Sequence, residues 1–337
     1  MSNSNEEEAI AIPIKISYPQ EEGHWKELIP GVRLLPYQGT ICDLIQQENV
    51  YLAPDCGRVI HPTHIIFIRP STYLYRVRKR INTEGSSVPE GAVESASSPD
   101  IARQCLIAAI LASRNGGSFA SVFTFRRRDG MWRTTGFSNH RLQEVSHGNC
   151  WALSPEPLDL EQTKQLAMKI DRYYRAIVWW EDRIGMALGY LWEGLTAAYA
   201  AQTYISLIAL IDSLVGTKSS GGHSIAERVA TMVGVDPTSR HEVYVEMVSL
   251  YRVRNRLVHG SAHPRKGKRT TETLSMGAKY SNIPREKMSK LIALCIQLIK
   301  SALDNPTYLS IVQSENTEDR ISKKLDTFFL GNLFGAP

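Results

Sequence analysis

The chain reads LYRVRNRLVHG from Leu250 to Gly260, and this stretch decides the fold that we expect for the C-terminal half. We predict a helix from about Arg240 to His259, because Ser239 and Glu242 have the spacing of a capping box and a glycine commonly ends a helix. An apolar stripe keeps to one face of this helix and consists of Val243, Met247, Leu250 and Val258. The sequence therefore predicts a helix that buries one face.

Arg254 lies on the same stripe, between Leu250 and Val258. Because arginine keeps its charge, its burial requires an acidic partner, either a carboxylate or a phosphate. In the preceding predicted helix, one acid, Asp212, lies in an apolar row with Tyr204, Ile208 and Val215. We therefore expect the two helices to pack with Asp212 orienting Arg254. The alternative is a purely structural salt bridge beside an incidental histidine.

The stretch resembles the signature of the HEPN superfamily, in particular its ApeA-like branch. That signature is an arginine, a polar residue, three further residues and a histidine, commonly followed by glycine. Residues 210–214 (LIDSL) resemble the acidic helix segment of the family, which more often has Glu than Asp, and residues 223–230 (HSIAERVA) resemble its short middle helix. The resemblance covers the C-terminal half and nothing before about Leu158.

The resemblance implies a helical domain that acts as a metal-independent endoribonuclease, with two copies of the motif facing one another in a homodimer. Many members are toxins or anti-phage effectors. Arg254, Asn255 and His259 are then the catalytic residues, and Asp212 supports them. We expect RNA as the substrate, with tRNA as one candidate, and no metal ion or cofactor.

The residue types fit this chemistry. RNA has its own nucleophile, the 2′-hydroxyl, so the protein must supply only proton transfer and charge stabilisation. A histidine such as His259 ordinarily has a pKa of about 6.5, which suits acid or base work at neutral pH. Arg254 can hold the phosphate, and Asn255 can position it. The expected product has a 2′,3′-cyclic phosphate.

Helix geometry complicates this site. Residues five apart on a regular helix are separated by about 140° around the axis. Arg254 and His259 can therefore meet only if the helix unwinds before Gly260 or if the site combines two copies of the chain. A non-catalytic protein that uses the helical domain to bind RNA or to dimerise is the alternative function.

The net charge of +5 does not by itself indicate nucleic-acid binding. A basic loop follows the motif, however, and could attract an RNA backbone. The candidate RNA-binding residues are Arg256, Arg265, Lys266, Lys268 and Arg269. The alternative is a solvated loop that only aids solubility.

Length and composition predict two domains in a cytoplasmic protein. The chain has 337 residues, of which 43% are hydrophobic, enough for two cores. Residues 1–8 (MSNSNEEE) are polar and acidic, so we expect no signal peptide. The most apolar stretch, 197–215, contains several polar residues, so we expect no membrane span.

We predict an α+β fold, with a mixed α/β domain at 1–154 and an all-α HEPN-type bundle at 155–337. The first domain should contain strands at 10–16, 64–68 and 73–81, a helix at 98–114, and a hairpin of 119–128 with 131–137. Pro13 suggests that its strand lies at a sheet edge. This domain is a candidate sensor for a phage-derived or cellular trigger, or a scaffold for the dimer.

The second domain should contain two long helices between Leu158 and Val215 and another from Pro284 to Leu303. Residues 328–334 (FFLGNLF) are unusually apolar for a chain end. We expect them to dock on a domain or on a partner subunit.

Overall fold

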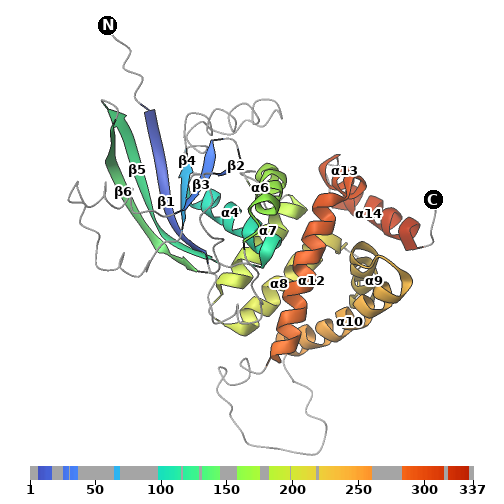
Figure 1. The fold of residues 1–337 in the computed structure, drawn as a ribbon. Coiled ribbons are helices and arrows are strands. Elements are labelled where there is room, and N and C mark those ends of the chain that lie inside the picture. The colour runs from blue at the N-terminus through green and yellow to red at the C-terminus, as the bar shows by residue number, and fades with distance from the viewer. Residues whose placement is uncertain are drawn as a thin grey trace, which may run out of the picture. The chain divides into compact units, whose positions relative to one another are not determined.

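The computed structural model describes residues 7–16, 26–29, 31–36, 64–68, 98–114, 117–128, 131–144, 158–174, 182–197, 199–217, 220–259, 283–314 and 318–333. The chain forms two compact units, one of residues 1–146 and 154–177, the other of residues 147–153 and 178–337. The described part of the first unit contains a β-sheet and two helices, and that of the second contains only helices (Figure 1). The chain is therefore an α+β protein, as the sequence predicts.

The described strands of the first unit form one sheet in which all neighbours are antiparallel. Across the sheet they are β2 (Lys26–Ile29), β3 (Val32–Pro36), β4 (His64–Ile68), β1 (Glu7–Ile16), β5 (Gly117–Arg128) and β6 (Met131–Glu144). The predicted strands at 10–16 and 64–68 are confirmed. The predicted hairpin is also confirmed, with Arg128 opposite Met131. The predicted strand at 73–81 lies outside the described residues.

β1 is a central strand, so the prediction that Pro13 marks a sheet edge is wrong. Pro13 lies opposite Ile65 on the β4 side, whereas pairing with β5 shifts register between Ala11 and Lys15. A proline has no N–H to donate, and a bulge is one of the few places where a strand tolerates that loss. The core continues through the bulge, because the flanking Ile12 and Ile14 are buried.

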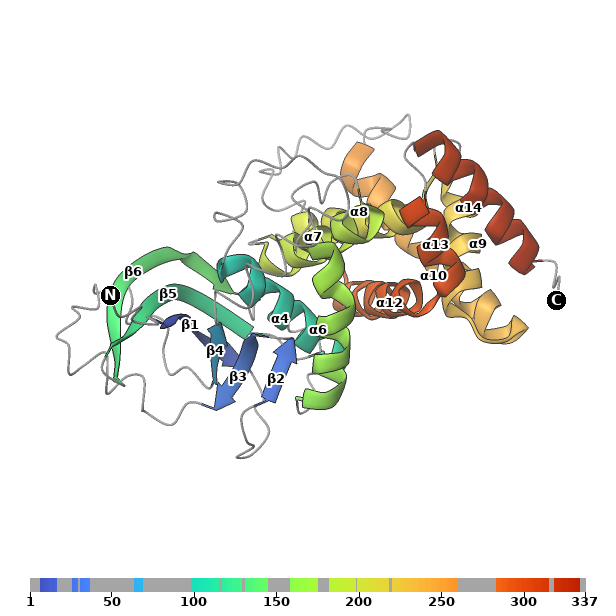
Figure 2. The same ribbon diagram turned by 90° about the horizontal axis from the view of Figure 1, so that it is seen from above.

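Helices α4 (Ser98–Ser113) and α6 (Leu160–Tyr174) pack on each other and on the sheet (Figure 2). The buried Gln104 joins them, because its Nε2 donates to the Ala167 carbonyl at 3.0 Å and to the Asp171 carboxylate at 3.1 Å. The helix predicted at 98–114 is confirmed. The structure places the boundary between the units after α6 rather than at residue 154, because α6 buries its apolar face in the first unit.

The described helices of the second unit are α7 (Arg183–Thr196), α8 (Ala200–Val215), α9 (Gly222–Val233), α10 (Pro237–His259), α12 (Arg285–Asp304), α13 (Pro306–Ser314) and α14 (Glu318–Leu333). Between Leu158 and Val215 the described residues therefore form three helices instead of the predicted two. α7 and α8 approach closely at Gly194, where an added Cβ would lie 3.3 Å from the Cβ of Ser206. In the part of the chain that the structure describes, no helix has both the length and the apolar character needed to cross a membrane.

The last four carbonyl groups of α8 all accept hydrogen bonds. A helix end leaves these groups without partners in its own ladder, and buried carbonyls must find donors elsewhere. The four bonds run from Gly216 N–H to Asp212 (2.8 Å), from Arg183 to Ser213 (3.1 Å), from the Tyr308 hydroxyl to Leu214 (2.8 Å) and from Arg228 to Val215 (2.8 Å). Side chains of α7, α9 and α13 thus converge on one end of α8.

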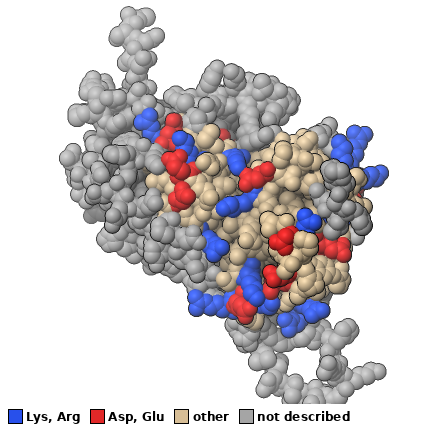
Figure 3. Space-filling model, turned by 45° about the vertical axis from the view of Figure 1, so that its right-hand side comes forward, with Lys and Arg blue, Asp and Glu red and all other residues tan. Residues whose placement is uncertain are grey.

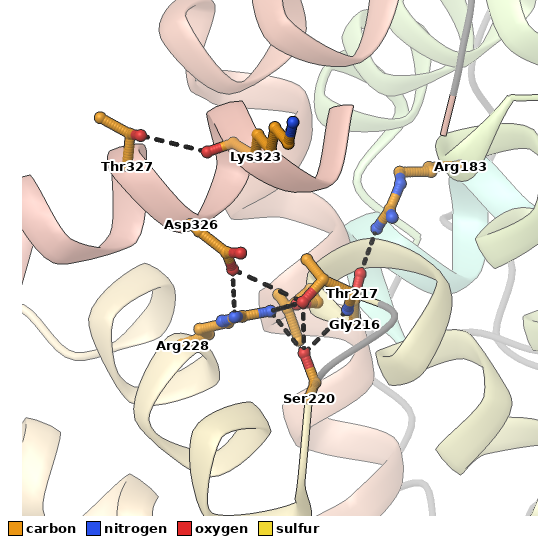
Figure 4. A network of polar contacts seen from close by, with 9 residues as sticks. Arg183, Gly216, Thr217, Ser220, Arg228, Lys323, Asp326 and Thr327 are labelled. Carbon is orange, nitrogen blue, oxygen red and sulfur yellow. Dashed lines mark hydrogen bonds and ion pairs between the residues drawn. The ribbon is translucent and has the colours of Figure 1, made fainter. Parts of the chain in front are cut away.

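Arg228 is the centre of this network (Figure 4). Its guanidinium also donates to Thr217 Oγ1 at 3.1 Å and to Ser220 Oγ at 2.7 Å, and it forms an ion pair with Asp326 of α14. The guanidinium carbon lies 5.6 Å from the centre of the Phe329 ring, which is also buried. Phe329, within the apolar stretch predicted to dock, is therefore buried on the second unit, whereas Leu330 is 55% exposed.

We expect Arg228→Met to destabilise the second unit. It leaves the Val215 carbonyl without a donor and removes the ion pair of Asp326, whose carboxylate keeps only a 3.5 Å hydrogen bond from the Thr217 hydroxyl. The cost should be about 2–3 kcal/mol in urea unfolding, since Arg228 is largely buried but Asp326 is partly exposed. Lys290→Met is the control, because Lys290 pairs with carboxylates only at the exposed surface. Identical unfolding curves for the two variants would contradict the role given to Arg228.

Candidate functional site

Helix α10 starts at Pro237, three residues earlier than the sequence predicts. The Asp236 carboxylate accepts from the backbone N–H groups of Thr238 and Ser239, both at 2.9 Å, and Ser239 Oγ accepts from the Asp236 N–H at 3.1 Å. These bonds lower the pKa of Asp236, and the bond from the Ser239 N–H has the largest effect. The predicted capping box of Ser239 and Glu242 is therefore wrong. Asp236 is the N-cap, and Pro237 takes the first helical position, where an N–H is not needed.

Two tyrosine hydroxyls hold α10 on α8. Tyr204 of α8 donates to the Leu250 carbonyl of α10 at 2.9 Å, and Tyr251 of α10 donates to the Asp212 carboxylate of α8. Burial raises the pKa of both phenols, and the charge of Asp212 raises that of Tyr251 further. Both hydroxyls therefore keep their protons and remain donors at neutral pH.

Tyr251 takes the place that the sequence assigns to Arg254 as the partner of Asp212. Within the described residues Asp212 and Arg254 form no ion pair, although the charge of Arg254 lowers the pKa of Asp212. Burial has the larger effect and raises that pKa, against the hydrogen bond from Tyr251 and the charge of Arg254. A phenol satisfies the partly buried carboxylate without the burial of a second charge, which explains why Arg254 need not be drawn into the helix contact.

The last turns of α10 leave the core. Met247 and Leu250 are fully buried, whereas Val258 is 46% exposed. The predicted apolar stripe therefore ends at Leu250 rather than at Val258. Arg254 is half-buried, and its Nη1 donates to Oδ1 of the exposed Asn255 at 3.2 Å. The two residues thus form a small polar pair at the point where the helix meets solvent.

Helix α10 remains helical through His259. Positions 254 and 259 are therefore separated by about 140° around the helix axis. Of the two geometries that the sequence leaves open, unwinding before Gly260 does not occur in the described helix. The remaining way to bring Arg254 and His259 to one phosphate is to take them from two copies of the chain.

A hollow of about 490 Å³ lies between the end of α10 and the start of α12, next to each other in Figure 1. Its polar lining consists of Ser249, Arg252, Asn255, Arg256 and Lys287. Lys287 of α12 also bonds Glu246 of α10 at 2.7 Å. Basic and acidic side chains are interspersed over the coloured part of the face shown in Figure 3. Three of the five polar residues that line the hollow are cations.

The structure brings only some of the predicted site residues together. Asp212 and Arg254 lie near Tyr251 where α10 meets α8, and Asn255 and Arg256 line the hollow. His259 is described as the last residue of α10 through its backbone alone. The remaining candidate RNA-binding residues lie outside the described residues and are Arg265, Lys266, Lys268 and Arg269.

The sequence prediction lacks the partner of Asp212, which is Tyr251, and two of the three cations of the hollow, which are Arg252 and Lys287. Tyr251 has a usable signal, because it lies four residues after the buried Met247 and thus on the same side of the helix. Arg252 lies one turn before Arg256, so it shares the face of a predicted RNA-binding residue. Lys287 has no local signal, since only the packing of α12 brings it to α10.

Comparison with protein-family models, with curated proteins and with solved structures finds no match to this chain. A functional interpretation therefore depends on the geometry at the end of α10 and on the motif resemblance in the sequence.

We expect Tyr251→Phe to cost about 2 kcal/mol of unfolding free energy, because it leaves the partly buried Asp212 carboxylate without its donor. Arg254→Ala should cost clearly less, since it removes only a longer-range attraction. Urea unfolding of the two variants makes the comparison. A larger loss for Arg254→Ala than for Tyr251→Phe would show that the arginine is the true partner of Asp212.

Asp212 should also make stability depend on pH. The unfolded carboxyl titrates near the ordinary value of 3.8, and burial raises the folded pKa above it. The folded state then binds more protons between these two values, so stability falls as pH rises through that window. Asp212→Asn keeps an acceptor for Tyr251 and removes the titration, so the pH dependence in this window should flatten. An unchanged profile in Asp212→Asn would contradict the raised pKa.

Proposed function

We propose that this protein is a metal-independent endoribonuclease whose site is the C-terminal end of α10. The observation that carries the proposal is the pair of Arg254 and Asn255, hydrogen-bonded at the point where α10 leaves the core, beside a hollow lined by cations. A buried structural arginine would be expected to meet a carboxylate. Arg254 is bonded instead to an exposed neutral amide, so its charge remains accessible to an anionic substrate.

Each residue of the motif has a distinct part in the proposed reaction. Arg254 holds the scissile phosphate and offsets the negative charge that grows in the transition state. Asn255 orients the Arg254 guanidinium through its Oδ1. His259 moves the proton between the 2′-hydroxyl and the leaving 5′-oxygen. The bond from the 2′-oxygen to phosphorus forms as the bond to the 5′-oxygen breaks, which leaves a 2′,3′-cyclic phosphate and a 5′-hydroxyl.

The proposed enzyme is a two-fold homodimer. Because α10 is helical from Pro237 to His259, one chain directs positions 254 and 259 to different sides. Two copies related by a two-fold axis can place Arg254 of one beside His259 of the other, and C2 dimers are the commonest closed assembly. Light scattering should then give about twice the chain mass of 37.8 kDa.

The resemblance to ApeA-like HEPN proteins supports this proposal and suggests a cellular role for the enzyme. The second unit is then a HEPN-type bundle in a cytoplasmic toxin or anti-phage effector that cleaves RNA, with tRNA as one candidate. The first unit, with its antiparallel sheet, is the proposed sensor of a phage-derived or cellular trigger. A non-catalytic RNA-binding or dimerisation scaffold is the alternative.

Incubation of the protein with total RNA and with tRNA in EDTA tests the reaction. We expect cleavage that is insensitive to EDTA and leaves cyclic phosphate ends. His259→Ala should lower the rate by about 10²- to 10⁴-fold, the usual contribution of a general acid or base. His223→Ala is the matched control, because His223 bonds the Tyr244 hydroxyl on an exposed surface between α9 and α10.

Full activity in His259→Ala, or a strict requirement for a divalent cation, would contradict the mechanism. RNA binding by the wild-type dimer with no cleavage of any RNA would favour the scaffold.

A further inference from the structure

Arg252 and Arg256 give the hollow between α10 and α12 its net charge. Both are exposed, and neither pairs with a carboxylate among the described residues. The third cation of the hollow, Lys287, belongs to a surface cluster of two lysines and two glutamates whose charges cancel. That cluster consists of Glu246, Glu286, Lys287 and Lys290. The unbalanced charge is therefore that of the two arginines.

These two arginines repel each other. Residues four apart are neighbours on a helix surface, and like charges there destabilise the helix. The helix dipole favours cations near its C-terminal end, but it amounts to about half a unit charge, and Arg254 lies in the same turns. The dipole thus compensates only part of the positive charge. An anion held between Arg252 and Arg256 would remove the remaining repulsion.

The hollow and Arg254 lie on different faces of α10, and Asn255 lies between them. At about 100° per residue, positions 252, 255, 256 and 259 fall within an arc of about 100°, and position 254 lies at least about 100° from each of them. A ligand in the hollow therefore approaches α10 along the face on which position 259 lies. On one chain, this face and the Arg254 face present two separate contacts to a polyanion.

The lining favours phosphate over base recognition. Its polar groups are cations, one amide and one hydroxyl, and its other residues are Val253 and Pro284. No aromatic ring in the described lining offers a surface on which a base could stack. Arginine forms charge-assisted, bidentate hydrogen bonds with phosphate, whereas base reading needs several fixed donors and acceptors.

We infer that this hollow binds the phosphate backbone of the RNA substrate, through Arg252 and Arg256, without reading its sequence. RNA as the ligand rests on the proposed function, whereas the anion preference follows from the charges of the hollow. The hollow thereby guides the strand onto the His259 face of each chain.

Binding of labelled RNA by the full chain with His259→Ala tests this inference, because the RNA is not consumed. Arg252→Gln and Arg256→Gln should each weaken binding about tenfold near physiological salt. Each should also reduce the slope of log Kd against log salt concentration by about 0.7–0.9, the effect of one phosphate contact. Oligonucleotides of equal length and different base composition should show equal losses.

Lys323→Gln on α14 is the matched control, because Lys323 is exposed and the substitution makes the same change in net charge. Salt slopes for both arginine variants that equal those of the control would overturn the inference. So would displacement of the RNA by an acidic peptide at equal charge concentration, since the hollow would then be a site for acidic proteins.

The outcome also separates this inference from the proposed reaction. Weaker RNA binding by the arginine variants, together with no cleavage by the wild type, would support RNA binding by the hollow and contradict the proposed nuclease activity. RNA cleavage by the wild type, together with equal salt slopes for the wild type and the arginine variants, would support the nuclease activity and contradict RNA binding by the hollow.

Discussion

The C-terminal end of α8 is the constraint on which the helical unit depends. Leu214 and Val215 are completely buried, so their carbonyl groups cannot turn to water. A buried carbonyl without a donor costs about 1–3 kcal/mol, and the donors come from Arg183, Tyr308 and Arg228 on three other helices. Each of those helices is thereby held where its donor reaches α8, and Arg228 extends the same arrangement to α14 through its ion pair. One helix end thus orders most of the unit.

This fixed α8 determines how α10 is presented. Tyr204 of α8 contacts Leu250 of α10, and Asp212 of α8 contacts Tyr251 of α10. Both contacts lie about one turn before Arg254. Beyond those contacts Val253 is still buried, and the other residues from Arg252 to Val258 are half-buried or exposed. The arginines of these turns are tolerated because they lie at the negative end of the helix dipole. Their combined charge exceeds the half unit charge of the dipole, so the end of α10 keeps a net positive charge among the described residues.

The sequence predicts well what depends on local periodicity. The alternation of isoleucines in β1 and the 3.6-residue period of α10 and α12 give elements that the structure confirms. It predicts poorly what depends on tertiary partners. The sequence predicts a sheet edge at Pro13 because a bulge leaves no local signal. It assigns α6 to the helical bundle because an amphipathic pattern does not indicate which unit covers the apolar face. The sequence pairs Arg254 with Asp212 because each is a single opposite charge on an apolar helix face, although the phenol of Tyr251, one turn away, satisfies the same carboxylate. Lys287 could not be found without the packing of α12.

The central claim is that a regular α10 forces Arg254 and His259 of one site to come from two chains. Mixing Arg254→Ala chains with His259→Ala chains, followed by unfolding and refolding together, tests it most directly. Random pairing makes about half of the dimers mixed, and one of their two sites is intact, so about a quarter of wild-type RNA cleavage should return. Each variant alone should remain inactive. No recovery in the mixture, with mixed dimers demonstrated by mass, would contradict the claim and place both residues of each site on a single chain.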